Sequence, residues 1–313
     1  MKIFRGTEQI PAEFGPSAVA IGKFDGVHAG HRAIIAELQL QAERAPIRLH
    51  TVAVTFDRNP LAVLAPEKCP DPLSGPQQKL ELLGKTGLDA CLVLAFTPEF
   101  AATEPEDFVR EVLLDALNAK LVLVGADFRF GAGGRGGVGL LAELGERYGF
   151  ELVVISDVMR AESRASSTRV RELLDVGDVS GAADVLGHLP AVRGMVVHGA
   201  ARGRELGFPT ANLEPDSEGF VPADGVYAGW LSDAGKRYPA AISVGNNPTF
   251  DTDERRQVEA YVIDETLDLY DHVVELEFAE RIRGMESFAG VDALVEQIAA
   301  DVDEAKRLLE LKP

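Results

Sequence analysis

Two histidines three residues apart stand where a predicted strand gives way to a predicted helix. The segment GKFDGVHAGH (22–31) follows the apolar run AVAI (18–21). A helix N-terminus offers free N–H groups and the positive end of the helix dipole, and both suit a phosphate. Gly30 lets a phosphate approach the backbone closely, while His28 and His31 can donate hydrogen bonds to charge that develops on phosphoryl oxygens. We therefore expect a phosphate-transfer site, although two turn histidines that cap a helix would give the same pattern.

A second predicted helix start supports this expectation. The segment SSTRVRELL (166–174) carries three hydroxyls and two positive charges, on Ser166, Ser167, Thr168, Arg169 and Arg171. An ordinary N-cap needs one serine, so three adjacent hydroxyls exceed what a cap requires. The segments TFDRNP (55–60) and VGADFRFGAGGRGG (124–137) also follow strand patterns, where open α/β sheets bind ligands. The second of them also fits a flexible glycine-rich surface loop.

A separate set of polar residues lies in the second half of the chain, in RGRELGFPTANLE (202–214). Its glycines permit close backbone approach and its proline fixes the chain before two oxygen-bearing side chains; the residues are Gly203, Gly207, Pro209, Thr210 and Asn212. Hydroxyl and amide oxygens are ligands that magnesium takes. Glu259, in QVEAYVID, could accept the proton of an attacking hydroxyl. A turn leading into a strand, and a solvent-facing strand glutamate, are the alternatives.

The elements that must position these residues differ between the two halves. Five continuous apolar runs are typical of strands buried on both faces of a parallel sheet: 18–21, 49–56, 89–96, 120–128 and 150–156. Helical patterns alternate with them. We predict a Rossmann-like, doubly wound α/β domain with a parallel sheet over residues 1–182.

Two of the helical patterns have specific signals. In HRAIIAELQLQAER (31–44), one helix face carries the apolar residues Ile34, Ile35, Leu38 and Ala42. In TEPEDFVREVLLDALN, Thr103 and Glu106 have the spacing of a capping box.

Residues 183–313 have a different rhythm, with short strand patterns separated by turn signals. SDAG (232–235) predicts a hairpin, and VVELEF (273–278) alternates apolar and acidic residues. We predict a small antiparallel β-barrel followed by a terminal helix over VDALVEQIAADVDEAKRLLEL. The domain boundary is expected within residues 178–190.

Composition narrows the class of protein. The chain has 313 residues and a net charge of −19, so nucleic acid is an unexpected partner. No apolar run reaches the length of a membrane span, and the N-terminus lacks the apolar core of a signal peptide. Cys69 and Cys91 have no metal-type spacing, which predicts free thiols in a reducing cytoplasm. The oligomeric state is open, and a homo-oligomer is compatible with the sequence.

Taken together, the motifs resemble those of one family. GKFDGVHAGH, TFDRNP, VGADFRFG and SSTRVR, in this order, are similar to the adenylyltransferase module of the bacterial bifunctional riboflavin kinase/FAD synthetases. GFPTANLE, PADGVYAGW, SVGNNPTF and QVEAYVID are similar to its flavokinase barrel. The resemblance covers essentially the whole chain. It implies that riboflavin and ATP give FMN and ADP in the second module, and that FMN and ATP give FAD and pyrophosphate in the first.

The resemblance also implies roles for individual residues. The ATP phosphates of the adenylyltransferase would be bound by Gly22, Phe24, Asp25, His28, Gly30, His31, Asn59, Ser166, Ser167, Thr168 and Arg169. Asp127 and Phe128 would lie on the flavin side of that site. In the kinase, Gly203, Gly207, Pro209, Thr210 and Asn212 would bind ATP, Thr210 and Asn212 would hold Mg²⁺, and Glu259 would be the catalytic base.

Three positions depart from the family pattern. Asn59 stands where many members have histidine, Asp271 where glycine is common and Met285 where an acidic residue is common. Two alternatives follow from other classes of protein. One is another H-x-G-H nucleotidyltransferase, acting for example on a pantetheine phosphate or a pyridine nucleotide, with an unrelated barrel attached. The other is a non-catalytic flavin-binding regulator built on a decayed enzyme.

Overall fold

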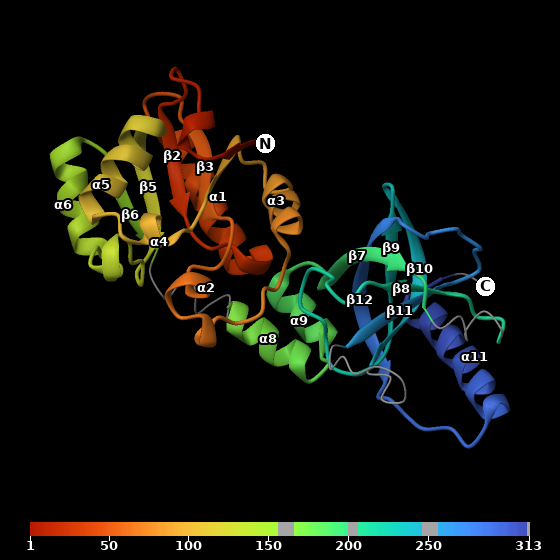
Figure 1. Ribbon diagram of the computed structural model, residues 1–313. Helices are drawn as coiled ribbons and strands as arrows, with labels where there is room; N and C mark the ends of the chain where they lie inside the picture. The colour runs from red at the N-terminus through yellow and green to blue at the C-terminus, as the bar shows by residue number, and fades with distance from the viewer. Residues whose placement is uncertain (156–165, 200–205, 246–255, 312–313) are drawn as a thin grey trace. The chain divides into compact units, whose positions relative to one another are not determined.

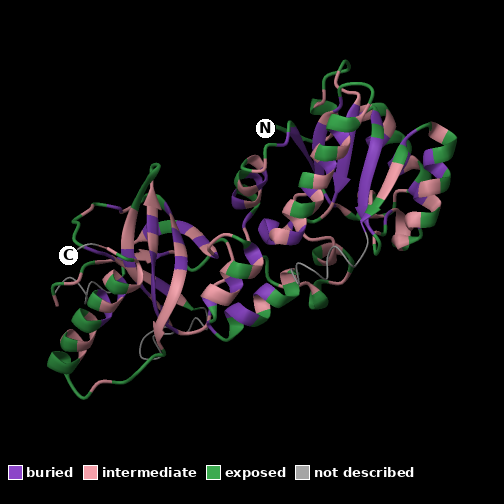
Figure 2. Ribbon diagram, turned by 180° about the vertical axis from the view of Figure 1, so that it is seen from behind, coloured by how far each residue is buried: buried purple, intermediate pink, exposed green. Residues whose placement is uncertain are grey.

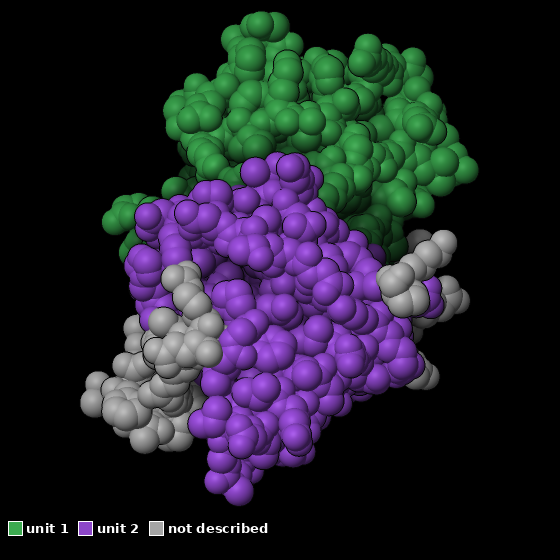
Figure 3. All heavy atoms as spheres, turned by 90° about the vertical axis from the view of Figure 1, so that its right-hand side faces the viewer, with its two compact units in different colours: residues 1–70, 76–165 green, residues 71–75, 166–313 purple. Residues whose placement is uncertain are grey.

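The fold is seen in a computed structural model that describes residues 1–155, 166–199, 206–245 and 256–311. The chain forms two compact units (Figure 3). Unit 1 comprises residues 1–70 and 76–165, and unit 2 comprises residues 71–75 and 166–313.

Unit 1 is built on a six-stranded parallel sheet with the order β1-β4-β3-β2-β5-β6. Its strands are β1 (Lys2–Arg5), β2 (Ser17–Ile21), β3 (His50–Phe56), β4 (Ala90–Leu94), β5 (Ala119–Gly125) and β6 (Glu151–Ile155). The five predicted strands are confirmed. Sequence reasoning missed β1, a four-residue edge strand that pairs in parallel with β4. The order around β2 is that of a doubly wound sheet, as predicted.

Helices cover both faces of this sheet (Figure 1). They are α1 (Ala29–Arg44), α2 (Leu61–Leu64), α3 (Pro76–Gly84), α4 (Pro98–Ala101), α5 (Pro105–Phe108) and α6 (Val138–Tyr148), with the 3₁₀ turns η1 (Thr7–Gln9), η2 (Asp25–Val27), η3 (Pro66–Lys68) and η5 (Ala132–Gly134) and the π-helical η4 (Val109–Ala116). Alternate residues of one strand enter different cores because successive strand side chains point to opposite faces. Ala18 and Ala20 pack with α1 and α3, whereas Val19 and Ile21 pack with η4 and α6. Both faces are therefore buried, which explains the continuous apolar runs.

The predicted apolar stripe is confirmed, whereas the predicted capping box is wrong. Ile35, Leu38 and Ala42 of α1 are buried. Pro105 occupies the first position of α5, so Glu104 rather than Thr103 is the N-cap. Proline has no N–H and suits the first helical turn, where that group would be unpaired.

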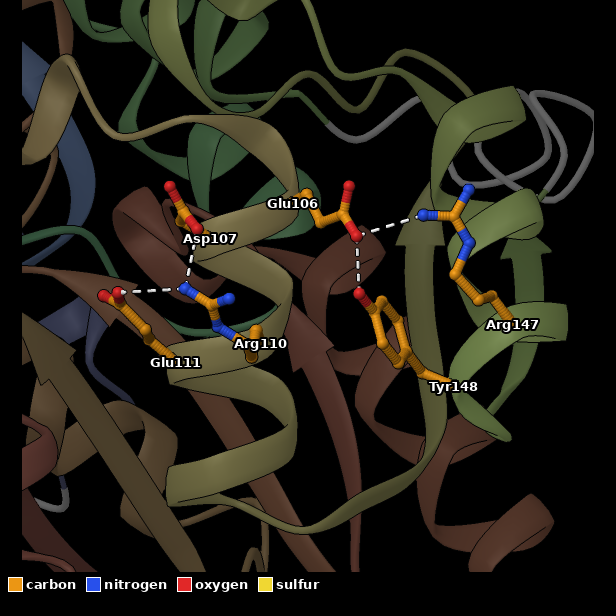
Figure 4. A network of polar contacts seen from close by, with 6 residues as sticks. All are labelled: Glu106, Asp107, Arg110, Glu111, Arg147 and Tyr148. Atoms are coloured by element: carbon orange, nitrogen blue, oxygen red, sulfur yellow. Dashed lines mark hydrogen bonds and ion pairs between the residues drawn. The ribbon is translucent and has the colours of Figure 1, made fainter.

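Glu106, the glutamate of the predicted capping box, makes a different contact. Its carboxylate accepts hydrogen bonds from the Arg147 guanidinium and the Tyr148 hydroxyl of α6, as Figure 4 shows. Glu106 therefore links α5 to α6 instead of capping a helix.

The two cysteines of unit 1 lie in different surroundings. Cys91 is buried in β4 and Cys69 is partly exposed, and both are free thiols. Burial raises the pKa of the Cys91 thiol to about 12. The thiolate is the reactive form, so Cys91 stays protonated and inert at pH 8.

We expect a chromogenic thiol reagent at pH 8 to modify Cys69 alone in the folded chain and both cysteines in denaturant. The Cys69→Ser variant should remain unlabelled until it is unfolded. Native-state labelling of that variant at the rate of a free peptide thiol would contradict the buried placement of Cys91.

Unit 2 is built on a closed antiparallel barrel with the order β10-β11-β8-β7-β12-β9, as predicted. Its strands are β7 (Ala191–Val197), β8 (Thr210–Leu213), β9 (Gly225–Asp233), β10 (Lys236–Gly245), β11 (Gln257–Val262) and β12 (Val273–Arg283). The hairpin between β9 and β10 is confirmed, with Ala234 at φ 46° and Gly235 at φ 81°. Positive φ at both positions is the geometry of a type I′ turn. Figure 2 shows buried residues alternating along the barrel strands.

Within its described residues, unit 2 also contains the helices α8 (Ser167–Asp175), α9 (Val179–Leu186) and α11 (Val291–Leu308). Side chains of α8 and α9 belong to the barrel core, together with Leu73 from the short segment 71–75. This packing places residues 166–182 with the barrel as compact structure. The division of the two activities between residues 182 and 183 stays a prediction.

The terminal helix is held to the barrel by a buried ion pair. The Arg283 guanidinium at the end of β12 donates to both carboxylate oxygens of Asp301 on α11, at 2.9 and 2.7 Å. The Asp301 side chain is 6% exposed and that of Arg283 is 17% exposed. Gln297 donates to the same carboxylate at 2.9 Å. The pair raises the pKa of Arg283 through the Asp301 hydrogen bonds, so Arg283 remains charged at every ordinary pH.

We expect Asp301→Ala to lower the free energy of unfolding of unit 2 by about 3 kcal/mol, because it leaves a largely buried guanidinium without its partner. The lone tryptophan, Trp230 in β9, reports on unit 2 in a urea titration. Glu296→Ala, at an exposed position of the same helix, is the matched control and should change stability by less than about 0.5 kcal/mol. An equal shift in both variants would contradict this role of the ion pair.

Candidate active sites

The first candidate site begins in a strained turn at the carboxyl end of β2. Phe24, Gly26 and Val27 all have positive φ, at 50°, 73° and 39°. Val27 is β-branched and rarely adopts such a backbone conformation, so the fold must hold it there. The side chains of Phe24 and Val27 are each 1% exposed and supply that anchoring. The turn ends at His28, which is thereby fixed at the start of α1.

The two histidines are in contact with each other. His28 is the N-cap of α1, and its Nδ1 accepts a hydrogen bond from the backbone N–H of His31 at 3.3 Å. The Nδ1 atom accepts, so the neutral ring carries its proton on Nε2, where it can donate. The two rings stack with centroids 3.7 Å apart, and the Phe24 ring lies 5.2 Å from that of His31. Capping and phosphate binding are therefore compatible roles of His28, because they use different nitrogens.

The other predicted residues of this segment lie in the same turn and at the start of the same helix. Gly30 is buried in the first turn of α1, and Asp25 lies in η2. A Cβ atom built on Gly22 would lie 3.3 Å from the Phe24 ring, so a larger side chain would press on the turn.

The TFDRNP segment (55–60) contains the last two residues of β3 and the loop that follows them at the same edge of the sheet. The Asp57 carboxylate accepts from the Phe96 amide at 2.8 Å and pairs with Arg58. Burial would raise the pKa of Asp57, but the hydrogen bonds from Arg58 and Phe96 lower it below the usual value. Asn59 Oδ1 accepts from the Leu61 amide at 3.1 Å, which leaves its NH₂ group as the donor. An amide donor at this position suits an anion without adding charge.

Asp127 and Phe128 follow β5, which is adjacent to β2 in the sheet. The Asp127 residue is exposed, and the half-buried Phe128 ring stacks on that of Phe130 with centroids 5.5 Å apart. Their position after a central strand fits the predicted ligand edge. Their contact with a flavin stays a prediction.

The SSTR segment belongs to unit 2 as compact structure. Ser166 is the N-cap of α8, and its Oγ accepts from the Arg169 amide at 3.1 Å. The Arg169 guanidinium pairs with Glu172 on the exposed surface of the helix. Ser167 and Thr168 occupy the first turn of α8. The serine cap is thus present, and the predicted role of this segment beside His28 stays a prediction.

The second candidate site lies on two neighbouring strands of the barrel. Thr210 and Asn212 are on β8. Glu259 is on β11, where it lies directly opposite Asn212 in the register of the two strands. The Thr210 hydroxyl donates to Glu259 Oε2 at 3.2 Å, and Asn212 Nδ2 lies 3.3 Å from that hydroxyl. Ala211 and Ala260, between these residues, belong to the barrel core. The three polar side chains therefore share the face of the strands that points away from the core.

Backbone features complete this cluster. Gly207 has φ 88°, a conformation that favours glycine, and Pro209 directly precedes β8. Sequence reasoning missed Gly199, where an added Cβ would lie 2.4 Å from Asn212 Oδ1. The close approach of that backbone leaves no space for a side chain beside Asn212. Gly203, another predicted member of the site, lies outside the described residues.

The donors of this cluster fit magnesium by their chemistry. A hydroxyl, an amide oxygen and a carboxylate are hard oxygen ligands. Within the described residues, no group of three or more histidine, cysteine, aspartate or glutamate side chains is placed to hold a metal ion. A magnesium ion here would therefore depend on Thr210, Asn212 and the phosphates of a nucleotide.

The structure explains one departure from the family pattern. Asp271 has φ 63°, a left-handed conformation in which glycine is unstrained and aspartate is tolerated better than most residues. Its amide donates to Val196 O at 3.0 Å, so the turn keeps its shape with aspartate. Met285 is 51% exposed, and its methyl group would lie 3.1 Å from a Cβ atom built on Gly245.

A doubly wound sheet with a phosphate-type turn, followed by a barrel with an outward-facing hydroxyl, amide and carboxylate, defines a two-unit nucleotide-dependent transferase. Family models support this class: one described as FAD synthetase matches residues 10–169, and one described as riboflavin kinase matches residues 186–309. The chain belongs to the family of bifunctional riboflavin kinases/FMN adenylyltransferases.

Individual relatives match over nearly the whole chain. The bifunctional riboflavin kinase/FMN adenylyltransferase of Escherichia coli (strain K12) is 36% identical over 99% of both chains. The protein of the same name from Pseudomonas fluorescens is 33% identical over 98% of both. A solved structure described as a macrolide-efflux protein from Streptococcus pneumoniae superposes with a TM-score of 0.83, at 31% identity over 97% of this chain and 98% of its own. In the described ranges of this chain, no helix combines the length and apolar character of a membrane span.

Proposed function

We propose that this chain makes FAD from riboflavin in two ATP-dependent steps, each in its own site. The barrel phosphorylates riboflavin to FMN and releases ADP. The α/β unit adenylylates FMN to FAD and releases pyrophosphate. Membership of the family over the whole chain supports the pair of reactions, and the presence of both polar clusters supports two working sites.

For the kinase step, the hydrogen-bonded Thr210–Glu259 pair is the observation that carries the proposal. Thr210 donates to Glu259 Oε2 and so orients the carboxylate. Glu259 Oε1 then accepts the proton of the ribityl hydroxyl as its oxygen attacks the γ-phosphorus of ATP. The bond from that phosphorus to the ADP oxygen breaks. When bound, Mg²⁺ supplies charge neutralisation at the phosphates, and we assign Thr210 and Asn212 to its site.

For the adenylyl transfer, the FMN phosphate is itself the nucleophile, so no protein nucleophile is needed. Its oxygen attacks the α-phosphorus of ATP, and the bond to the pyrophosphate oxygen breaks. His28 donates from Nε2, and the positive end of the α1 helix dipole favours the same phosphates. We assign Asn59 and the SSTR segment to ATP, and Asp127 and Phe128 to the flavin.

A product assay tests the proposal. The purified chain is incubated with riboflavin, ATP and Mg²⁺, and flavins and nucleotides are resolved over time by chromatography. We expect FMN and ADP first, followed by FAD and pyrophosphate. Unchanged riboflavin, with ATP intact, would contradict the proposal and favour the flavin-binding regulator. Adenylylation of a pantetheine phosphate or a pyridine nucleotide in place of FMN would favour another nucleotidyltransferase.

A further inference from the structure

A lysine outside every motif joins the two loops of the first site. Lys79 lies on α3, and its ammonium donates a hydrogen bond to the carbonyl of Phe56 at 2.7 Å. Phe56 is the last residue of β3, directly before Asp57. The same helix packs against η2, the turn that contains Asp25. Lys79 therefore contacts the base of one loop from a helix that supports the other.

The charges around Lys79 explain why a cation is held there. The side chain is half-buried. Burial lowers the pKa of Lys79, while the charges of Asp25 and Asp57 oppose this shift by favouring the ammonium. The Cys91 thiol also lies nearby, but its pKa of about 12 leaves it neutral at physiological pH. Asp25 and Asp57 are therefore the anions that favour the Lys79 ammonium at neutral pH, and Asp57 is in addition paired with Arg58 at 2.8 Å.

This compensation matters because ATP is a polyanion. Two carboxylates beside the predicted phosphate turn repel an arriving triphosphate, and the repulsion is stronger in a partly buried site than in water. Partial burial of an ammonium is unfavourable by itself. Partial burial therefore disfavours the charged form of Lys79, whereas the positive charge of Lys79 favours the binding of ATP at the site.

We propose that Lys79 is a positioning residue of the adenylyl transfer, which holds the 22–28 and 56–60 loops together and offsets the charges of Asp25 and Asp57 where the ATP triphosphate enters. This inference rests on the proposed function of unit 1. It assigns Lys79 no contact with the substrate; the residue acts through the two loops.

The test compares Lys79→Gln with Lys85→Gln in the complete chain. Both variants remove one positive charge, but Lys85 is exposed just beyond the end of α3. With FMN as substrate, we expect Lys79→Gln to raise the KM for ATP about tenfold, with a smaller change in kcat, because the Asp25 and Asp57 charges are then less compensated where the ATP triphosphate enters. Lys85→Gln should leave both constants within about twofold of the parent. FMN formation from riboflavin by the same samples is the internal control for intact protein.

Two further variants separate charge compensation from packing. Lys79→Arg keeps the charge and is expected to stay within about threefold of the parent KM for ATP, although arginine and lysine differ in shape. In an Asp57→Asn background, the Lys79→Gln penalty should fall below about threefold, because one of the compensated charges is already absent.

Several outcomes would overturn the inference. Equal KM values for ATP in Lys79→Gln and Lys85→Gln would overturn it. A Lys79→Arg variant with a KM for ATP raised as much as in Lys79→Gln would also overturn it. An unchanged penalty in the Asp57→Asn background would exclude charge compensation. Failure of the parent chain to make FAD would instead refute the proposed function, which keeps the two ideas distinguishable.

Discussion

Glu259→Gln is expected to slow FMN formation from riboflavin by about 10³-fold, while FAD formation from supplied FMN stays at the parent rate. Glutamine has the shape of glutamate and can still accept the Thr210 hydrogen bond seen at 3.2 Å. It cannot take the proton of the attacking hydroxyl, and loss of a general base typically costs about 10²–10⁴ in rate. The measurement is the initial rate of each step by chromatography.

Two matched variants sharpen this prediction. Thr210→Val removes the hydroxyl that orients the carboxylate while keeping a β-branched side chain suited to the strand, so we expect a smaller loss of the same step. Glu277→Gln changes a glutamate on β12 whose carboxylate pairs with Arg237, and should leave FMN formation unchanged. A Glu259→Gln enzyme that still phosphorylates riboflavin within tenfold of the parent would exclude the base role.

His28→Asn is expected to slow FAD formation from FMN by about 10²–10³, the usual effect of removing one donor from developing phosphoryl charge. The Asn side chain oxygen can replace Nδ1 as the cap of α1, because asparagine is a preferred N-cap. The variant therefore removes the Nε2 donor and keeps the helix start. Phosphorylation of riboflavin should be unaffected.

His28→Gln is the complementary control. Its amide nitrogen can approach the position of Nε2, but it does not reproduce the Nδ1 cap, so we expect more FAD formation than with asparagine and lower stability. Thermal unfolding followed by circular dichroism measures the stability of each variant. If asparagine retained full adenylyltransferase activity, His28 would be a helix cap only, and the phosphate role would be wrong.

Regular elements with a strong pattern were predictable from the sequence, and the weakly patterned ones were not. Strands β2 to β6 are continuous apolar runs because helices cover both faces of the sheet. β1 has four residues, of which only Phe4 is buried, so it left no comparable signal. β8 has only Ala211 and Leu213 facing the core, and its other two residues belong to the polar site. Because two of its four residues serve the polar site, β8 has too few apolar residues to be recognised as a strand from the sequence.

The site residues divide in a similar way. Residue type and close spacing were enough to predict four site residues from the sequence: His28, His31, Thr210 and Asn212. Lys79 and Gly199 do not, because their partners lie elsewhere in the chain: Lys79 reaches Phe56 across 23 positions, and Gly199 matters only through its closeness to Asn212. Contacts of this kind come from the fold, and no local pattern encodes them.

The central claim is that one chain carries two independent active sites, and a mixing experiment tests it most directly. His28→Asn and Glu259→Gln are each supplied with riboflavin, ATP and Mg²⁺, separately and then together. We predict FMN alone from the first, almost no flavin product from the second, and FAD from the mixture, because FMN released by one variant becomes the substrate of the other. A mixture that accumulates FMN without FAD, although the Glu259→Gln enzyme is present, would show that the Glu259→Gln change also abolishes the adenylylation of FMN, and would contradict the account of two independent sites.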